Sequence, residues 1–390
     1  MRYRWRMMHH KAGMFSGAAP LGLRQLSLAE YAAMAPEFAA LAAKAADPNP
    51  HMSPASVSAA ASLLAQDDIV ILAVTDQAHG HALAGIWALG LSRPAWAMGI
   101  PVLTAPVLPL YDVLSLPVVD ASQLGPVLDV MLAHVVMDPL LPRLIRCPAL
   151  ATGTATGKAL LQLLPKHRAK VTLYESWQRA ILKPGTGITA DDYLRAGMGH
   201  SYKNYMAKRR ALERSGKIGF AMHRREAAIA ALPRFLALEA SGWKGKAGTA
   251  MASNPRHAAY AAELVIQLAA QDEVMIAELT RDGTPLSMGL LPVSGGTSCF
   301  IKAAYDEQVR KHAPGFLLQM EVTAALMADP GFRLMDSGMD DTGDIMVWSE
   351  RRGMAHGLIA LGTAPTAWLA AHGLALRQRL RHARRHVLKG

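Results

Sequence analysis

A short basic loop carries the residues whose types and spacing best suit the binding of an anion. It reads Arg310-Lys-His-Ala-Pro-Gly315 and separates a predicted strand at 297–304 from a predicted helix at 316–328. The first N–H groups of a helix have no partner within it, and that end of the helix carries partial positive charge. The pattern predicts a binding site for a negatively charged group such as a diphosphate. Its predicted ligands are Lys302, Arg310, Lys311, Gly315 and the backbone of Phe316, Leu317 and Leu318. The alternative is an ordinary strand-to-helix turn with solvated basic side chains.

Two further side chains at predicted strand ends have the right chemistry to move a proton. Asp336 closes a predicted strand at 332–336, and a carboxylate whose pKa is raised by its surroundings can act as a general base. Nearby Asp340, Asp341 and Asp344 are alternatives for that role. Tyr305 follows the strand before the loop and has a hydroxyl that can protonate a leaving group. The competing interpretations are a carboxylate that caps the following turn and a half-buried tyrosine at a strand end.

A third candidate follows a predicted helix at 226–240. The loop at 242–248 combines an aromatic ring, two cations and three glycines, which indicates a substrate-binding segment formed by Trp243, Lys244 and Lys246. The same segment is also typical of a loop that ends a helix and is anchored by its tryptophan.

The alternation of elements predicts a mixed α/β (α+β) fold that repeats one plan in two halves. Each half is expected to contain one or two helices, a three-stranded antiparallel meander, a helix, a strand, a helix and a strand. In the first half, Ser27 and Glu30 have the spacing of a capping box and begin a helix expected to reach residue 46. Near the C-terminal end, a short helix is expected to stop close to Arg352.

The positive charge of the chain belongs to its ends. The net charge is +11, and residues 1–20 and 366–390 contribute four and six basic residues and no acidic residue, which leaves the body at 11 − 10 = +1. This distribution argues against a nucleic-acid-binding body. Runs of about 20 apolar residues, the signature of a membrane span, are not seen, and the N-terminus lacks the apolar core of a signal peptide. The expected location is the cytoplasm.

Three other sequence patterns bear on ligand binding. Cys147 and Cys299 lie in apolar runs, which predicts buried thiols and no disulfide framework. Gly153-Thr-Ala-Thr-Gly157-Lys158 lacks the glycine spacing and the following Ser or Thr of a P-loop, so it is rejected as a nucleotide site. No set of His, Cys and acidic residues has metal-ligand spacing, so no metal is expected.

Two blocks of sequence, Leu238–Met251 (LEASGWKGKAGTAM) and Lys302–Leu318 (KAAYDEQVRKHAPGFLL), resemble a known family. Together with Asp336-Ser-Gly and Trp348-Ser-Glu-Arg-Arg, they are similar to bacterial GNAT-superfamily acetyltransferases of the CelD, cellulose-biosynthesis type. Those proteins are in turn related to the Fem-type peptidyl transferases. The loop departs from the general GNAT phosphate pattern, because it has a single glycine preceded by a proline.

The resemblance implies two tandem GNAT-like domains, each a mixed, mostly antiparallel sheet flanked by helices. The expected organisation is a basic extension (1–20), a degenerate domain (21–185), an acyl-CoA-binding domain (186–365) and a basic C-terminal helix (366–390). It also implies an acyltransferase that moves an acetyl or similar group from acetyl-CoA to an amine or hydroxyl. The acceptor would be a small molecule, glycan or peptide linked to cell-envelope or exopolysaccharide metabolism. The strands that flank the loop would separate to admit the pantetheine arm, between residues 299–304 and 333–336.

Alternatives from other functional classes remain open. A Fem-type transferase would take its acyl group from aminoacyl-tRNA, and the basic strip at 202–225 would suit tRNA or an anionic substrate; the bland interpretation of this strip is a solvated helix between domains. A non-enzymatic factor for polysaccharide synthesis would use the amphipathic C-terminal helix at an anionic inner-membrane surface. The same helix could equally pack on the protein body.

Overall fold

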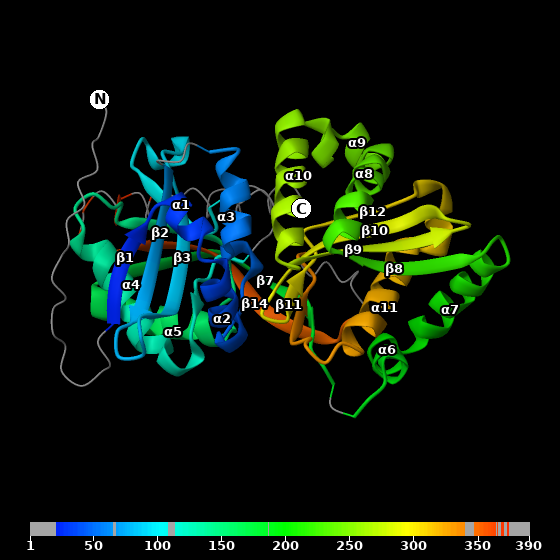
Figure 1. Cartoon of the computed structure of the whole chain (residues 1–390), viewed down its shortest axis with the longest axis horizontal. Coiled ribbons are helices and arrows are strands. Elements are labelled where there is room, and N and C mark those ends of the chain that lie inside the picture. Colours follow the sequence, from blue (N-terminus) through cyan, green and yellow to red (C-terminus); the bar gives the residue numbers. More distant parts are fainter. Residues whose placement is uncertain are drawn as a thin grey trace, which may run out of the picture.

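A computed structural model describes residues 21–363 except 65–67, 108–113, 186 and 340–346, together with residues 365, 368, 369 and 373. Its strands form one mixed sheet with helices on its faces, so the predicted α/β class is correct. The strands run in the order β1-β2-β3-β4-β6-β14-β7-β13-β11-β10-β9-β8, and β5 and β12 pair beside β3 and β10. Figure 1 shows two lobes joined at the centre by β7 and β14.

The strands of the N-terminal half are β1 (Leu21–Leu26), β2 (Ile69–Asp76), β3 (Ala82–Ser92), β4 (Val102–Thr104), β5 (Val118–Val119), β6 (Leu144–Leu150) and β7 (Lys170–Leu182). Those of the C-terminal half are β8 (Ile218–Arg224), β9 (Val274–Arg281), β10 (Thr284–Ser294), β11 (Thr297–Cys299), β12 (Lys302–Tyr305), β13 (Leu334–Asp336) and β14 (Glu350–Ala360).

The α-helices cover both faces of the sheet (Figure 1). They are α1 (Leu28–Ala32), α2 (Ala35–Lys44), α3 (Pro54–Ala61), α4 (Leu124–Met137), α5 (Ala155–Leu163), α6 (Ala190–Met198), α7 (His200–Glu213), α8 (Arg225–Ser241), α9 (Trp243–Lys246), α10 (Pro255–Ala270) and α11 (Pro314–Met327). Short 3-10 helices include η1 (Pro50–Met52), η4 (Ala121–Gln123), η5 (Leu164–His167) and η7 (Glu307–His312).

Local capping and proline explain where several helices begin. The capping box at Ser27 is confirmed: its hydroxyl accepts the N–H of Glu30, and the Glu30 carboxylate accepts the N–H of Ser27 at 2.8 Å. The helix expected to run from there to residue 46 is wrong, because the chain breaks after α1 and restarts as α2 with Pro36 in its first turn. Proline fits there because the first N–H groups of a helix need no partner within it.

Three other expectations about local structure were wrong. The basic loop at 310–315 is largely helical, since η7 covers Glu307–His312 and α11 begins at Pro314. The loop at 242–248 contains the single-turn helix α9. The short helix expected to end near Arg352 does not do so: Glu350 to Arg352 begin β14, where backbone pairing with β7 holds them extended.

Strands β7 and β14 tie the two halves together. They pair antiparallel along their length, from Glu350↔Ile181 to Ala360↔Lys170, and β14 also pairs with β6. Met354 and Ile359 of β14 pack into the apolar core of the N-terminal half, whereas Ala180 and Leu182 of β7 pack into that of the C-terminal half. Each half thus completes its core with a strand from the other. The domain boundaries stay a prediction.

Candidate active site

The predicted strand at 297–304 is interrupted, and the interruption lies where two strands part. In β11, Ser298 pairs with Val293 of β10, whereas in β12 Lys302 pairs with Leu290, a shift of one residue that marks a β-bulge at 300–301. The Phe300 N–H donates to the carbonyl of Asp336, and the next N–H donates to Leu290. The chain therefore stays beside β10 with a shifted register and stops pairing with β13.

The end of this pairing separates β12 from β13. Strand β11 pairs in parallel with β13 as far as Cys299↔Asp336, and beyond this point β12 is paired with β10 alone. Bulges are common beside active sites because they redirect the chain and end its pairing. The divergence falls within the segments, 299–304 and 333–336, between which the sequence analysis expects a pantetheine arm.

The N-terminal turn of α11 lies next to Tyr305 at the end of β12. A Cβ atom added to Gly315 would meet the Tyr305 ring at 4.0 Å, with no closer neighbour, so this side of the turn is open. Phe316 stacks on Tyr205 of α7, with ring centroids 4.8 Å apart. The structure thus brings Tyr305, Gly315 and Phe316 together.

The backbone N–H groups of this turn are only partly available. Those of Phe316 and Leu317 both donate to the carbonyl of Ala313, at 3.0 and 3.2 Å. Pro314 has no N–H, and no side chain caps the helix. Gly315 is therefore the best-placed backbone donor among the residues predicted to bind a diphosphate, and the surrounding side chains must supply most of the charge.

Cations from three elements surround the turn. Arg310 and Lys311 are exposed on η7, and α7 packs against η7. Lys208 of α7 lies over the Tyr205 ring, 5.0 Å from its centroid. The pKa of His312 is lowered by burial and by the charges of Lys311, Arg281 and Lys208, so these cations share one neighbourhood and the imidazole is neutral at pH 7. The field at this end of α11 is positive.

The two sequence blocks that carry the family resemblance contact each other directly. The Glu239 side chain is fully buried at the end of α8, and its carboxylate pairs with Lys302 of β12 at 3.2 Å and accepts the N–H of Met251 at 2.8 Å. Lys244 donates to the carbonyl of Ala303 at 2.5 Å and lies 3.9 Å from Glu239. Burial, followed by the charge of Lys302, lowers the pKa of Lys244.

A second acidic residue forms the outer link between these blocks. Glu307 accepts the N–H of Trp243 at 2.6 Å and pairs with Lys246 at 3.4 Å. The hydrogen bond from Trp243 is the main cause of the lowered pKa of Glu307. Trp243 itself is 54% exposed. The three residues predicted to bind substrate thus lie beside β12 and η7, with an exposed indole ring and two lysines that the protein's own carboxylates partly neutralise.

Asp336 lies in a different environment from the one predicted. It ends β13 as expected, but its side chain is fully buried between two guanidinium groups: Arg179 of β7 at 3.6 Å, and Arg352 of β14. Its Oδ1 also accepts the N–H of Gly338 at 2.7 Å. These contacts stabilise the charged carboxylate and separate it from solvent, which favours a structural role; the role as general base stays a prediction.

Residues from the N-terminal half complete this buried cluster. His51 of η1 places its Nε2 3.2 Å from the Cys299 thiol. Burial and then the charge of Arg179 lower the pKa of His51 to about 3, and burial raises that of Cys299 to about 12. Both side chains are therefore uncharged at neutral pH. Cys147 and Cys299 are free, buried thiols, as predicted.

Sequence reasoning missed the partners in these clusters. Glu239, Glu307 and Arg352 all lie within the quoted blocks, so the acidic and basic residues there were an unused signal. Arg179 and His51 carry no such signal, because Arg179 reaches the site through the pairing of distant strands and His51 through the packing of η1 on β10 and β11. The alternative bases Asp340, Asp341 and Asp344 lie outside the described residues.

Comparison with known proteins finds a family match within the C-terminal half. Residues 199–344 match the family model described as an acetyltransferase (GNAT) domain. The chain contains a GNAT-type acetyltransferase domain. The match includes the α11 turn, both acidic links and Asp336. It supports an acyltransferase in general, while the acyl donor, the acceptor and the resemblance to the CelD type stay predictions. A search among curated proteins found no match.

Solved structures share the fold over almost the whole chain. FemX is similar with a TM-score of 0.59 and 12% identity, covering 90% of this chain and 100% of FemX. The C-terminal domain of a putative lysylphosphatidylglycerol synthetase from Agrobacterium fabrum has a TM-score of 0.52 and 12% identity, covering 91% and 96%. A conserved protein of unknown function from Bacteroides thetaiotaomicron has a TM-score of 0.52 and 11% identity, covering 87% and 99%. At these identities the likeness concerns the fold.

Two searches for other kinds of site found nothing in the described part of the chain. No cluster of three or more His, Cys, Asp or Glu side chains there has a geometry suited to a metal ion. Among the same residues, no helix has both the length and the apolar character to span a membrane.

Proposed function

We propose that the protein is an acyl-CoA-dependent N-acyltransferase whose donor site lies at the N-terminal turn of α11. The observation that carries the proposal is the separation of β12 from β13, together with a helix N-terminus surrounded by cations at the far end of β12. The domain match supports the acyltransferase class.

The residues around α11 suit the charged part of acyl-CoA. Arg310, Lys311 and Lys208 supply positive charge from two elements, and Gly315 leaves the turn open toward Tyr305. Acyl-CoA itself would supply the acyl group as a reactive thioester. The chain would hold the diphosphate at this turn and admit the pantetheine arm beyond the bulge at 300–301. A fixed orientation of donor and acceptor lowers the entropic part of the barrier.

The residues proposed to move protons lie near the opening between β12 and β13. The hydroxyl of Tyr305, whose ring lies beside Gly315, would protonate the leaving thiolate. Asp336 was predicted to accept the proton of an acceptor amine or hydroxyl, but its two guanidinium partners make it better suited to fix β7, β13 and β14 around the site. The exposed Trp243 with Lys244 and Lys246 would contact the acceptor or the adenine end of the donor. A link to cell-envelope or exopolysaccharide chemistry belongs to this proposal through the CelD resemblance.

A second candidate is a Fem-type transferase that takes its acyl group from aminoacyl-tRNA. The similarity to FemX over the full chain favours it, and the cations of α7 and η7 would suit an RNA backbone equally well.

Titration calorimetry separates the two candidates. The full chain is titrated with acetyl-CoA and, separately, with aminoacyl-tRNA at two salt concentrations. We expect saturable binding of acetyl-CoA and weak tRNA binding that is lost at the higher salt. Absence of acetyl-CoA binding at high micromolar ligand, with tight and salt-dependent tRNA binding, would replace the first candidate with the second.

A further inference from the structure

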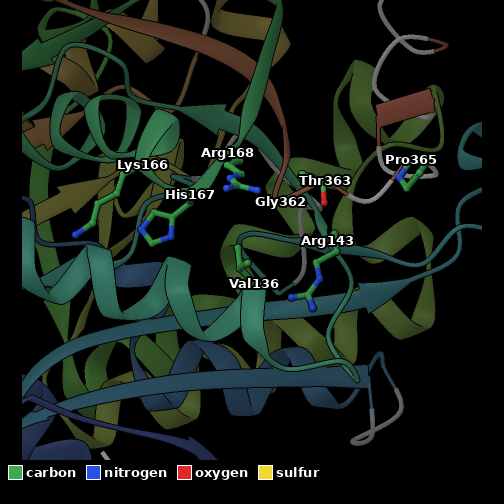
Figure 2. Close-up of a pocket in the computed structure, with 8 residues that line it drawn as sticks. All are labelled: Val136, Arg143, Lys166, His167, Arg168, Gly362, Thr363 and Pro365. Carbon is green, nitrogen blue, oxygen red and sulfur yellow. The ribbon is translucent and has the colours of Figure 1, made fainter. Parts of the chain in front are cut away.

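An open cavity of about 610 Å³ lies in the N-terminal half, where the end of β14 passes between α4 and η5. Figure 2 shows the side chains of its lining, which include four basic residues from two segments of the chain. The lining consists of Val136, Arg143, Lys166, His167, Arg168, Gly362, Thr363 and Pro365. None of these residues belongs to the candidate active site.

The charges in the cavity are only partly balanced from within the protein. Asp129 of α4 pairs with Lys166 at 2.7 Å and with His167 at 2.8 Å. Arg143 donates to the carbonyl of Val135 and so compensates the negative end of α4. Arg168 is exposed. Even without the imidazole, the lysine and the two arginines of the cavity outnumber this carboxylate by 3 − 1 = 2 among the described residues.

Exposed apolar side chains flank these cations. Met137, at the end of α4, is 73% exposed, and Leu140, in the loop that leads to Arg143, is 67% exposed. On the other side, Trp368 donates its indole N–H to the carbonyl of Gly362 at 3.1 Å, and the neighbouring Leu369 is 66% exposed. Solvent-exposed apolar residues next to a basic cluster are the combination that binds the interface of an anionic bilayer.

The chain that follows the cavity continues the same charge. Residues 363–390 include Arg377, Arg379, Arg381, Arg384, Arg385 and Lys389 and no acidic residue. This basic segment adjoins the cavity in sequence. Asp138, the nearest other acid on α4, is already engaged by Gln25 and lies with 18% of its side chain exposed.

We propose that this cavity binds the phosphate headgroup of an anionic phospholipid, with Arg143, Lys166 and Arg168 as cationic ligands and Met137 and Leu140 inserted at the bilayer surface. This proposal is independent of the donor site on α11. It assigns membrane contact to the folded N-terminal half, in addition to any contribution from the basic C-terminal segment.

The test is co-sedimentation of the full chain with vesicles of phosphatidylcholine alone or of phosphatidylcholine mixed with phosphatidylglycerol. Three variants are compared with wild type: Arg168→Glu, the pair Met137→Ser and Leu140→Ser, and the control Lys158→Glu. Lys158 is exposed on α5 in the same half, and its substitution changes the net charge as much as Arg168→Glu does. All variants keep the C-terminal segment, so any loss is due to the cavity and its rim.

We expect wild type and Lys158→Glu to bind the phosphatidylglycerol vesicles and not the neutral ones. Arg168→Glu should weaken binding roughly tenfold or more, because each basic residue near an anionic surface contributes roughly fivefold to the affinity and the new carboxylate is also repelled by that surface. The Met137/Leu140 pair should weaken it less. Wild-type binding by both cavity variants would overturn the proposal. So would inorganic phosphate binding that Arg168→Glu removes while vesicle binding is unchanged, since the ligand would then be a soluble phosphate.

Discussion

Helices α4 and α11 hold matching places in the two halves, yet their N-terminal turns carry different charge. Each has 14 residues, follows an antiparallel meander and is preceded by a 3-10 helix capped by an aspartate. In the N-terminal half, the residues between Asp120 and α4 are the uncharged Ala121-Ser-Gln. In the C-terminal half, the longer η7 adds Arg310, Lys311 and His312.

The surroundings of the two turns enhance this difference. Beside α4, the Asp120 carboxylate pairs with Lys44 at 2.7 Å, and Gln123 donates to Asp76 at 2.7 Å. Burial raises the pKa of Asp120, but hydrogen bonds from Lys44 and Ser122 more than offset that effect, so the group is ionised at neutral pH. The turn of α4 therefore has no excess of basic side chains to attract an anion. The proposed donor site is accordingly expected only in the half where basic residues replace the neutral ones.

The strands that follow α4 and α11 also differ in how they end. The substitution with the largest expected effect tests this difference. Strand β6 ends at the buried Leu150, whereas β13 ends at Asp336 between two arginines. Asp336→Asn should lower the free energy of unfolding by about 3–5 kcal/mol, because it leaves two buried guanidinium groups without their counter-charge. Urea unfolding measures this.

The matched control for this substitution is Asp329→Asn. Asp329 accepts the N–H of Gly331 at 2.8 Å, just as Asp336 accepts that of Gly338, but it lies at the exposed end of α11. It should change stability little. If Asp336→Asn folds with wild-type stability and loses acyl transfer across pH 6–9, the carboxylate is the general base after all.

The second prediction removes the charge difference between the two helix ends. Arg310→Glu with Lys311→Glu should weaken acetyl-CoA binding by roughly a hundredfold, since a four-unit change of charge opposes the diphosphate at a helix N-terminus. Calorimetry on the variant measures the dissociation constant. As a control, Arg93→Glu with Lys158→Glu makes the same change of charge in the N-terminal half. Equal weakening by both pairs would show a general charge effect and remove α11 from the donor site.

The sequence predicts those parts of the fold and of the candidate site that depend on neighbouring residues, and it misses those that depend on distant residues. The capping box at Ser27 and the alternating strands depend on neighbouring residues, and both were located from their patterns. The basic segment at 310–315 was expected as a loop but is largely helical. The bulge at 300–301 was missed because it follows from a shift of register on β10 and the end of pairing with β13, which no local pattern records. The environment of Asp336 depends on Arg179, more than 150 residues away, through the pairing of β7 with β13 and β14.

The third prediction concerns pH and the contact between the halves at Glu273. Burial raises the pKa of Glu273 to about 7, and a hydrogen bond from Ser53, in the N-terminal half, opposes that shift. Between about pH 4.5 and 7 the folded chain keeps a proton that the unfolded chain releases, so this residue's contribution falls as pH rises through that window. The loss should be on the order of 3 kcal/mol.

Urea unfolding of wild type and Glu273→Gln at pH 5 and pH 7.5 checks the sign. The substitution should stabilise the chain at pH 7.5 relative to wild type and change it little at pH 5, because glutamine imitates the protonated side chain. Carboxylates with lowered pKa values, such as those of Asp76 and Glu278, act in the opposite direction in both proteins and cancel in the difference. An identical pH profile for the two proteins would show that Glu273 is ionised in the fold at both pH values.

The substitution with the smallest expected effect compares the two acidic residues that join the sequence blocks: Glu307 on the outside and the buried Glu239. Glu307→Gln keeps an acceptor for the Trp243 N–H but loses the ion pair with Lys246, whose side chain is 74% exposed. Exposed pairs contribute little, so acetyl-CoA affinity should fall by less than about fivefold. Glu239→Gln, which removes the charge buried against Lys302, should have the larger effect on stability. Glu307→Gln could instead weaken acetyl-CoA binding as strongly as the double charge reversal on η7. Glu307 would then position the donor site by holding α9 against η7, and the exposed indole of Trp243 would be part of that site.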